Sequence, residues 1–248
     1  GQDELFLRTN STYYRFLNCG FRLAATGGSA MGVMAVPLGY SRTYAKLDGP
    51  LTEANYLKAI HAGRTFATSG PMLTLTADGL DCGAEIRYSA TASKPIRIEA
   101  KLRSIQPIDS LELVSNGKVI ESVNLKGRPS SPVLRQESRG LEESIVLALE
   151  PRRSGWVAAR AIFTAPDGRL RQAHTSPIYV TVDGNPIASK ADAEYMIRWI
   201  DRLLQVAEKP GRYKSDTECS QVQAIYQQAR QKYQDIARQA AEFWGEGP

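Results

Sequence analysis

The spacing of apolar residues along the 248-residue chain changes twice, near residues 71 and 188. Before residue 71, short helical patterns alternate with glycine-rich segments. Between residues 72 and 187, apolar and polar positions alternate over short stretches, which is typical of strands that bury one face. From residue 188 the apolar period lengthens to about 3.6, which predicts amphipathic helices. The pattern therefore predicts three regions: 1–71, 72–187 and 188–248.

The middle region carries seven strand patterns separated by turn residues, and this spacing is typical of an antiparallel immunoglobulin-like β-sandwich, with a barrel as the alternative. Asn116-Gly117 predicts a two-residue type I′ hairpin, because both turn positions need a positive φ. Pro166-Asp167-Gly168 predicts a second turn. The predicted strands span residues 72–79, 96–104, 110–116, 118–125, 143–150, 155–165 and 177–184.

The first region contains two helical patterns. The first covers residues 12–18. The second begins after Thr52 as its N-cap, carries Leu57 and Ile60 on an apolar face, and ends at Gly63.

The last region predicts an antiparallel pair of helices, broken at Pro210-Gly211 and restarted at Ser215 with Glu218 in capping-box position. One predicted apolar face comprises Met196, Trp199, Ile200, Leu203 and Ala207. The other comprises Val222, Ile225, Ala229, Tyr233, Ile236 and Ala240. The fold class expected is α+β, mainly β: a truncated α/β segment, a central antiparallel immunoglobulin-like β-sandwich, and a C-terminal helical hairpin that packs on the rest.

Composition narrows the function classes. The 31 basic residues are scattered among 26 acidic ones and form no basic patch. The net charge of +5 therefore does not by itself predict a nucleic-acid binding surface. No apolar run reaches the ~18 residues of a membrane span. The three cysteines are far apart and indicate neither a disulfide framework nor a metal site. Gly1-Gln-Asp-Glu is typical of a cleaved tag, and a periplasmic or secreted location is expected if an upstream export signal has been removed.

Residue types alone predict no complete active site. His61 and His174 are the two histidines of the chain, and neither lies in a metal-binding spacing. No GxSxG elbow for a nucleophilic serine is present.

Five stretches, however, resemble a known family in the same order along the chain: YYRFLNCGFRLAATGGSA, VPLGYSRTYAKLDGPLTEANYLKAIHAGRTFATSGPMLTLTADG, SGWVAARA, AHTSPIYVTVDG and ADAEYMIRWIDRLL. They are similar to the C-terminal part of bacterial CehA/McbA-like metallohydrolases of the polymerase-and-histidinol-phosphatase (PHP) superfamily. The resemblance implies a hydrolase of amide, ester or carbamate-type bonds that uses divalent zinc or manganese. It also implies that residues 1–71 are the C-terminal remnant of a PHP-like α/β barrel.

In that family a metal-binding acid follows the glycine-rich turn as Gly-[Ser/Thr]-Asp, and an HxH motif lies upstream. Gly28 and Ser29 match this turn, but Ala30 stands in place of the acid. A methyl group cannot coordinate a cation or accept a proton. The resemblance therefore implies a degenerate ligand loop, a chain that is catalytically inert and holds no metal by itself, and the N-terminal barrel half of the same protein as its partner.

Four residues are candidates for substrate binding: Arg42, Arg64, His61 and His174. The two arginines could bind an anionic group at the barrel mouth. The alternative is that they pair locally, with Asp48 or with backbone carbonyls.

Two other functions compete with the hydrolase-like one. The first is a β-sandwich binding module for a glycan, peptide or partner protein, although Trp156 and Tyr179 are expected to pack in the core rather than stack on a sugar. The second is a homodimer formed through aromatic residues of the C-terminal helices, namely Tyr226, Tyr233, Phe243 and Trp244.

Overall fold

A computed structural model describes residues 2–30, 32, 37–91, 94–127, 141–165, 168–208 and 213–244. Within these residues the protein is mixed helix and sheet, mainly strands, with a pair of helices at its C-terminal end. The helices are α1 (Gln2–Asn18), α2 (Glu53–His61), α3 (Lys190–Ala207) and α4 (Asp216–Trp244). The strands are β1 (Arg42–Ala45), β2 (Thr65–Thr68), β3 (Met72–Ala77), β4 (Leu80–Asp81), β5 (Glu85–Tyr88), β6 (Ile96–Ser104), β7 (Ser110–Ser115), β8 (Lys118–Asn124), β9 (Leu141–Leu149), β10 (Gly155–Thr164), β11 (Leu170–Thr175) and β12 (Ile178–Val182).

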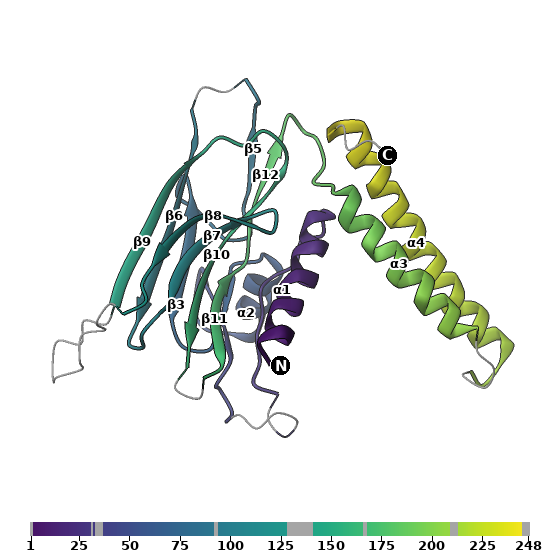
Figure 1. Ribbon diagram of the computed structural model, residues 1–248, viewed down its shortest axis with the longest axis horizontal. Helices are drawn as coiled ribbons and strands as arrows, with labels where there is room; N and C mark the ends of the chain where they lie inside the picture. Colours follow the sequence, from purple (N-terminus) through teal and green to yellow (C-terminus); the bar gives the residue numbers. More distant parts are fainter. Residues whose placement is uncertain are drawn as a thin grey trace.

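The strands form two sheets that share one apolar core (Figure 1). The smaller sheet has the order β4-β3-β6-β9. The larger has the order β1-β2-β11-β10-β12-β5, and β7 joins β10 to β8. Leu75 and Ile98 of the smaller sheet and Leu113 and Val180 of the larger one are buried in this core. Alternate residues of β3 and β6 therefore face inward, as the period-2 pattern predicts.

All seven predicted strands are confirmed, as β3, β6, β7, β8, β9, β10 and β12. The hairpin is confirmed too, because Asn116 and Gly117 have φ values of 49° and 83° between the paired residues Ser115 and Lys118. Pro166 and Asp167 of the second predicted turn lie outside the described residues. The pairing of β5 with β12 is parallel, an arrangement that the hairpin-like spacing does not predict.

Beside these seven, the described residues hold five further strands: β1, β2, β4, β5 and β11. They are short, and β11 carries polar side chains whose partners come from a distant helix. β2 pairs with β11 along Thr68–Phe66, so the hairpin of β1 and β2 extends the larger sheet. The N-terminal and middle regions consequently share one continuous sheet.

The N-terminal helix α1 covers the outer face of the larger sheet. Tyr14 and Leu17 pack against Trp156 and Tyr179, whose exposed fractions are 1% and 4%. The expectation that these two aromatic residues pack in the core is confirmed. The helix is longer than predicted, and the chain turns at Gly20, whose φ is 81°.

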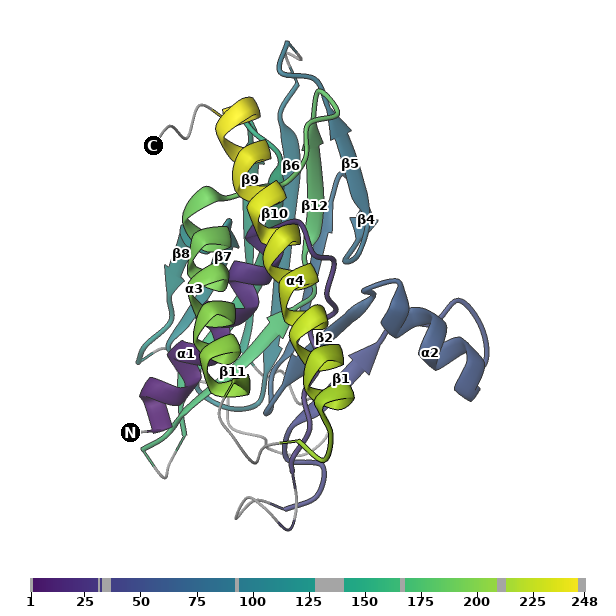
Figure 2. The same cartoon turned by 90° about the vertical axis from the view of Figure 1, so that its right-hand side faces the viewer.

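The helix α2 begins at Thr52, whose side chain accepts a hydrogen bond from the backbone N–H of Asn55. It ends before Gly63, which has a φ of 67°. Its apolar face was predicted wrongly: Leu57 is exposed, and Ala59 is the buried residue. Figure 2 shows that α2 stands apart from the other helices, beside β1.

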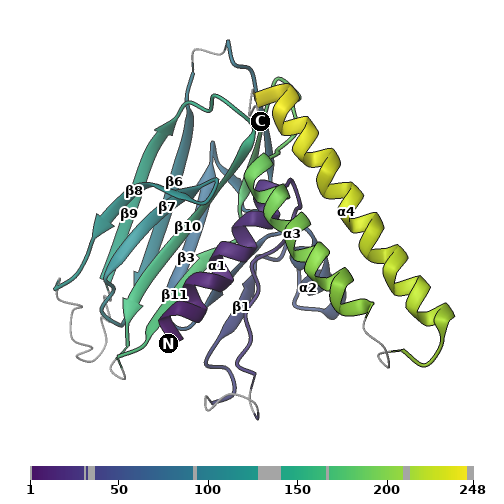
Figure 3. The ribbon, with the colours of Figure 1, turned by 45° about the vertical axis from the view of Figure 1, so that its right-hand side comes forward.

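The helices α3 and α4 run side by side and project away from the sheets (Figure 3). Both predicted starts are confirmed, since Ser189 accepts from the N–H of Asp192 and Ser215 accepts from that of Glu218. Residues 209–212, which hold the predicted break, lie outside the described residues. None of the helices in the described part of the chain combines the length and the apolar character that a bilayer crossing requires.

The faces that α3 and α4 bury differ from the predicted faces. Trp199 and Leu203 are 48% and 38% exposed, and Ile225 of α4 is 63% exposed. The physical reason is that α4 packs on α3, while α3 packs on α4 and α1, so the buried positions form narrow seams rather than one wide stripe. The seam consists of Ala193, Met196, Ile200 and Ala207 of α3 with Tyr233, Ile236 and Ala240 of α4.

Candidate functional site

The predicted site residues lie on two opposite faces of the larger sheet. On the outer face, Ala67 of β2 pairs with His174 of β11. Gly27 lies close to the methyl group of Ala67. On the inner face, Phe66 packs toward the core, and Arg64 lines a cavity beside it. The structure therefore does not bring the seven predicted residues together.

The outer-face group, here called the His174 network, comprises Tyr14, His174, Arg160 and Glu112. The imidazole Nδ1 lies 2.7 Å from the carbonyl oxygen of Thr175, and Nε2 lies 2.8 Å from the hydroxyl of Tyr14. Because a carbonyl can only accept, Nδ1 carries the proton and Nε2 accepts from Tyr14. Both ring nitrogens are thereby occupied.

Arg160 and Glu112 complete this network. The guanidinium donates to the carboxylate at 2.8 Å, and both side chains are largely covered, with exposed fractions of 13% and 14%. A second guanidinium nitrogen lies 3.4 Å from the hydroxyl of Tyr14. The network thus joins α1 to three strands of the larger sheet through buried, satisfied polar groups.

Burial determines the protonation state of His174. Desolvation, helped by the positive charge of Arg160 and opposed by the hydrogen bond to the Thr175 carbonyl, lowers the pKa of the imidazole to about 4. The ring is neutral at pH 7 and shielded from solvent by Tyr13 and Tyr14. This environment fits a structural hydrogen-bonding role and gives a substrate no access to the ring.

The glycine-rich loop lies beside this network, on the same face. The hydroxyl of Ser29 accepts from the N–H of Ser41 and donates to its carbonyl, at 3.0 and 3.3 Å. Gly27 donates to the hydroxyl of Thr43 at 2.8 Å. Ala30 follows in the left-handed region, with a φ of 47°, and its side chain is exposed.

These residues do not fit the divalent metal that the resemblance implies. Gly28 and Ala30 have no side-chain donor, and the Ser29 hydroxyl is already used by the backbone of Ser41. Across the ranges that the structure describes, no group of three or more His, Cys, Asp or Glu side chains is arranged to hold a metal ion. No reaction step is therefore assigned to a metal at this loop.

The inner-face group, here called the Arg64 cluster, comprises Lys46, Asp48, Arg64 and Asp81. Arg64 donates from both terminal nitrogens to the two oxygens of Asp48, one bond measuring 2.8 Å, and lies 3.8 Å from Asp81. Lys46 binds both oxygens of Asp81 at 2.7 and 2.8 Å. The alternative reading of Arg64, as a partner of Asp48, is confirmed.

The Arg64 cluster lies at a cavity of about 270 Å³. Leu73 and Leu75 form fully buried parts of its wall, and Phe66 lies stacked on Tyr44 with ring centroids 4.9 Å apart and planes 4° apart. Cys82 also lines the cavity, and desolvation raises the pKa of its thiol to about 12. The cavity therefore has an apolar interior and a charged rim.

The two remaining candidates are exposed. Arg42 of β1 lies with its guanidinium 5.9 Å from the ring centre of Tyr44, on the strand face that also carries Lys46. His61 lies in the last turn of α2. No described contact places His61 at either group.

Sequence reasoning missed Lys46, Phe66, Asp81 and Cys82 as members of one site. One signal was present, since Arg42, Tyr44 and Lys46 occupy alternate positions and must share a strand face. No comparable signal links Asp81 to them, because it comes from β4, the two-residue strand that follows β3. Gly83 allows this approach: a Cβ atom there would lie 1.8 Å from the carbonyl oxygen of Ala62.

Comparison with known proteins adds little to this description of the site. No family model matches the chain, and no curated protein matches it. Among solved structures, it is similar to a neutron crystallographic structure of a Jonesia denitrificans lytic polysaccharide monooxygenase. The identity is 9%, the match covers 63% of this chain and 87% of that one, and the TM-score is 0.25. A likeness at this level carries no argument about function.

Proposed function

We propose that this chain is the C-terminal part of a CehA/McbA-like, metal-dependent-hydrolase-like protein of the PHP superfamily, and that the chain itself is catalytically inert. In this proposal residues 1–71 derive from a PHP-like barrel, residues 72–187 form an immunoglobulin-like sandwich, and the N-terminal barrel half of the same protein is the partner. Amide, ester or carbamate-type bonds are the substrate class, and zinc or manganese is the metal of the complete protein.

The observation that carries the proposal is the chemistry of the glycine-rich loop. Ser29 and Gly27 fix the loop against β1, yet position 30 offers a methyl group where the resemblance implies a carboxylate. A left-handed φ favours Asp, Asn or Gly over Ala, so the backbone conformation suits an acid better than the residue present. This combination is what a ligand loop that has lost its acid would retain.

The test measures metal and turnover on the same sample. The purified chain is dialysed against zinc or manganese, its metal content is measured by plasma emission, and hydrolysis of p-nitrophenyl acetate is followed. We expect far less than one metal per chain and no turnover above buffer. Stoichiometric metal together with turnover would refute inertness.

The variant Ala30→Asp sharpens this test, with Ala30→Asn as its matched control of the same shape. If the loop is a degenerate ligand site, the added carboxylate raises zinc binding relative to Asn. Equal zinc binding by the two variants would count against the ligand-loop assignment, independently of any catalytic measurement.

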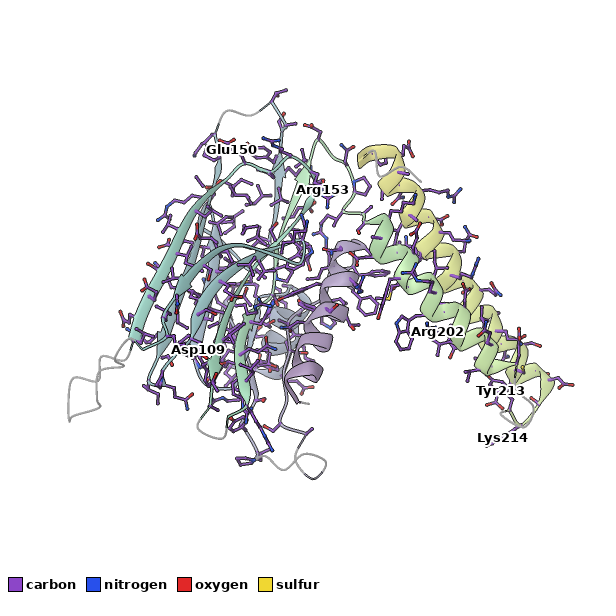
Figure 4. All side chains as sticks on the ribbon, in the orientation of Figure 1. Asp109, Glu150, Arg153, Arg202, Tyr213 and Lys214 are labelled. Atoms are coloured by element: carbon purple, nitrogen blue, oxygen red, sulfur yellow. The ribbon has the colours of Figure 1, made fainter. Side chains whose placement is uncertain are left out.

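One observation favours the alternative, a module that binds a partner protein. Trp199 and Leu203 are exposed one turn apart on α3, with the exposed residues Arg198 and Arg202 beside them. Neither arginine forms an ion pair with a described residue. Figure 4 shows Arg202 on α3, with Tyr213 and Lys214 at the end of the helical pair farthest from the sheets. Basic residues beside an apolar strip fit an acidic amphipathic helix.

This alternative is tested by fluorescence anisotropy with an acidic amphipathic peptide. Binding by the wild type that Trp199→Ala weakens would support it, and equal binding by both would not. Light scattering of the same samples tests the expected homodimer. Of the aromatic residues expected at that contact, Tyr233 is buried, Phe243 is exposed, and the side chain of Trp244 lies outside the described residues.

A further inference from the structure

The cavity at the Arg64 cluster has the composition of a small-molecule site. Its interior is apolar, with Phe66, Met72, Leu73 and Leu75 in the wall, and its polar atoms are concentrated at the rim. Its volume of about 270 Å³ lies just below the range of roughly 300–1,000 Å³ that is typical of sites for drug-sized ligands. A ligand that fits it is correspondingly small.

The wall favours a planar ligand. Tyr44 and Phe66 already form a parallel stack, and Tyr44 retains 36% of its accessible surface. A third ring can add to such a stack or meet its edge, because both geometries are favourable for aromatic rings. Met72, which is 40% exposed at the cavity, contributes a polarisable side chain beside the rings.

The charges at the rim favour an anion. Three cations lie there or on the adjoining strand face, Arg42, Lys46 and Arg64, against two carboxylates, Asp48 and Asp81. Arg42 forms no ion pair with any residue in the described ranges. The local excess of one positive charge matches a ligand with a single negative charge.

One of the two carboxylates is exchangeable. The side chain of Asp48 is 74% exposed, whereas that of its partner Arg64 is 22% exposed. Leaving Arg64 would return Asp48 to water, while the less exposed guanidinium would keep only its longer contact with Asp81, at 3.8 Å. Asp81 is held differently, since Lys46 binds both of its oxygens. A ligand carboxylate can therefore take the place of Asp48 and leave the Lys46–Asp81 pair intact.

We propose that this cavity binds a small aromatic monocarboxylate, whose ring lies against the Tyr44–Phe66 stack and whose carboxylate binds Arg64 in place of Asp48. The site requires no metal and no residue of the glycine-rich loop. The inference goes beyond the proposed function, and it stands or fails separately from the metal and turnover measurements.

Isothermal titration of the full chain with phenylacetate tests this site, with benzyl alcohol as the neutral analogue and phenethylamine as the cationic one. We expect phenylacetate to bind most tightly, and Asp48→Asn to bind it about tenfold more tightly by removing the internal competitor. Arg64→Gln is expected to weaken binding by tenfold or more. The matched control Arg238→Gln breaks an exposed pair with Asp235 on α4, outside the cavity lining, and should leave the affinity unchanged.

Asp48→Asn keeps the proposal falsifiable even if Arg64→Gln impairs folding, because it removes a solvent-exposed charge and predicts a gain. Three results would overturn the proposal: no phenylacetate binding, equal affinity for phenylacetate and benzyl alcohol, or weaker binding by Asp48→Asn. Tighter binding of phenethylamine than of phenylacetate would mean that the acidic residues of the rim bind a cation. That result would also overturn the proposal.

Discussion

The His174 network and the Arg64 cluster use the same kinds of residues in opposite ways. Each contains an arginine paired with an acid, and each lies against an aromatic pair. In the network both members of the Arg160–Glu112 pair are largely covered, whereas in the cluster the acid of the Arg64–Asp48 pair is largely in solvent. Burial fixes the partners of the first arginine and leaves those of the second open to exchange.

This contrast explains why residue type is a poor guide to a binding site. His174 is the residue that chemistry would select first, yet both its nitrogens are occupied and no solvent reaches it. Arg64 is expected from its pattern to make a local pair, and it does so, beside a cavity. The accessibility of the partner, rather than the identity of the residue, separates the two groups.

The largest expected effect comes from removing the arginine of the Arg160–Glu112 pair. Arg160→Ala leaves the Glu112 carboxylate buried without its cation, which costs about 3–5 kcal/mol in the free energy of unfolding. The matched control is Arg103→Ala, which breaks the exposed pair with Glu142 and should cost less than about 1 kcal/mol. Urea denaturation at pH 7 measures both. Similar losses in the two variants would show that the network is not a buried unit.

The next effect is the pH dependence that His174 confers. Its pKa is about 4 in the folded protein and about 6.5 in the unfolded chain, so between these values the unfolded state binds the extra proton. The stabilisation is therefore fully present above pH 6.5 and is lost as the pH falls toward 4, by about 3 kcal/mol.

Urea denaturation at pH 7 and pH 4.5 measures this dependence. His174→Gln should reduce the loss of stability on acidification, whereas His61→Gln, at an exposed position, should leave it as in the wild type. A loss of the same size in His174→Gln and the wild type would contradict the assignment.

The smallest effect concerns the loop beside the network. Ala30 holds a left-handed φ of 47°, so Ala30→Gly should raise the free energy of unfolding by about 0.5–1 kcal/mol. The control Ala148→Gly, in an exposed position of β9, should lower it by a similar amount. Thermal denaturation suffices for both. A loss of stability in Ala30→Gly would mean that the methyl group makes contacts of its own.

The sequence pattern predicts the parts of this fold whose signals are local. The seven strands, the Asn116-Gly117 hairpin and the helix starts at Thr52, Ser189 and Ser215 depend on neighbours within a few residues. The faces of α3 were predicted less well, because the seam that α4 covers depends on a partner more than twenty residues away. Trp199 fits the helical period yet remains largely exposed.

The candidate sites were harder to predict for the same reason. Tyr14 and His174 are 160 residues apart in the chain and meet through a hydrogen bond, and no local spacing records that contact. Asp81 reaches Lys46 over 35 residues. The pairing of Arg64 with Asp48, by contrast, spans 16 residues across one hairpin and helix, and it was anticipated.

The junction of β2 with β11 also bears on aggregation. The buried hydroxyls of Thr65 and Ser176 lie 2.7 Å apart, and both bond to the backbone of Ala25. A fragment that starts at Met72 would lose β2 and leave one edge of β11 with unpaired backbone groups. Such an edge can recruit a strand from another molecule. The pairing of β2 (Thr65–Thr68) thus covers an edge of β11 that would otherwise be open, and β1 becomes the outermost strand on that side of the sheet.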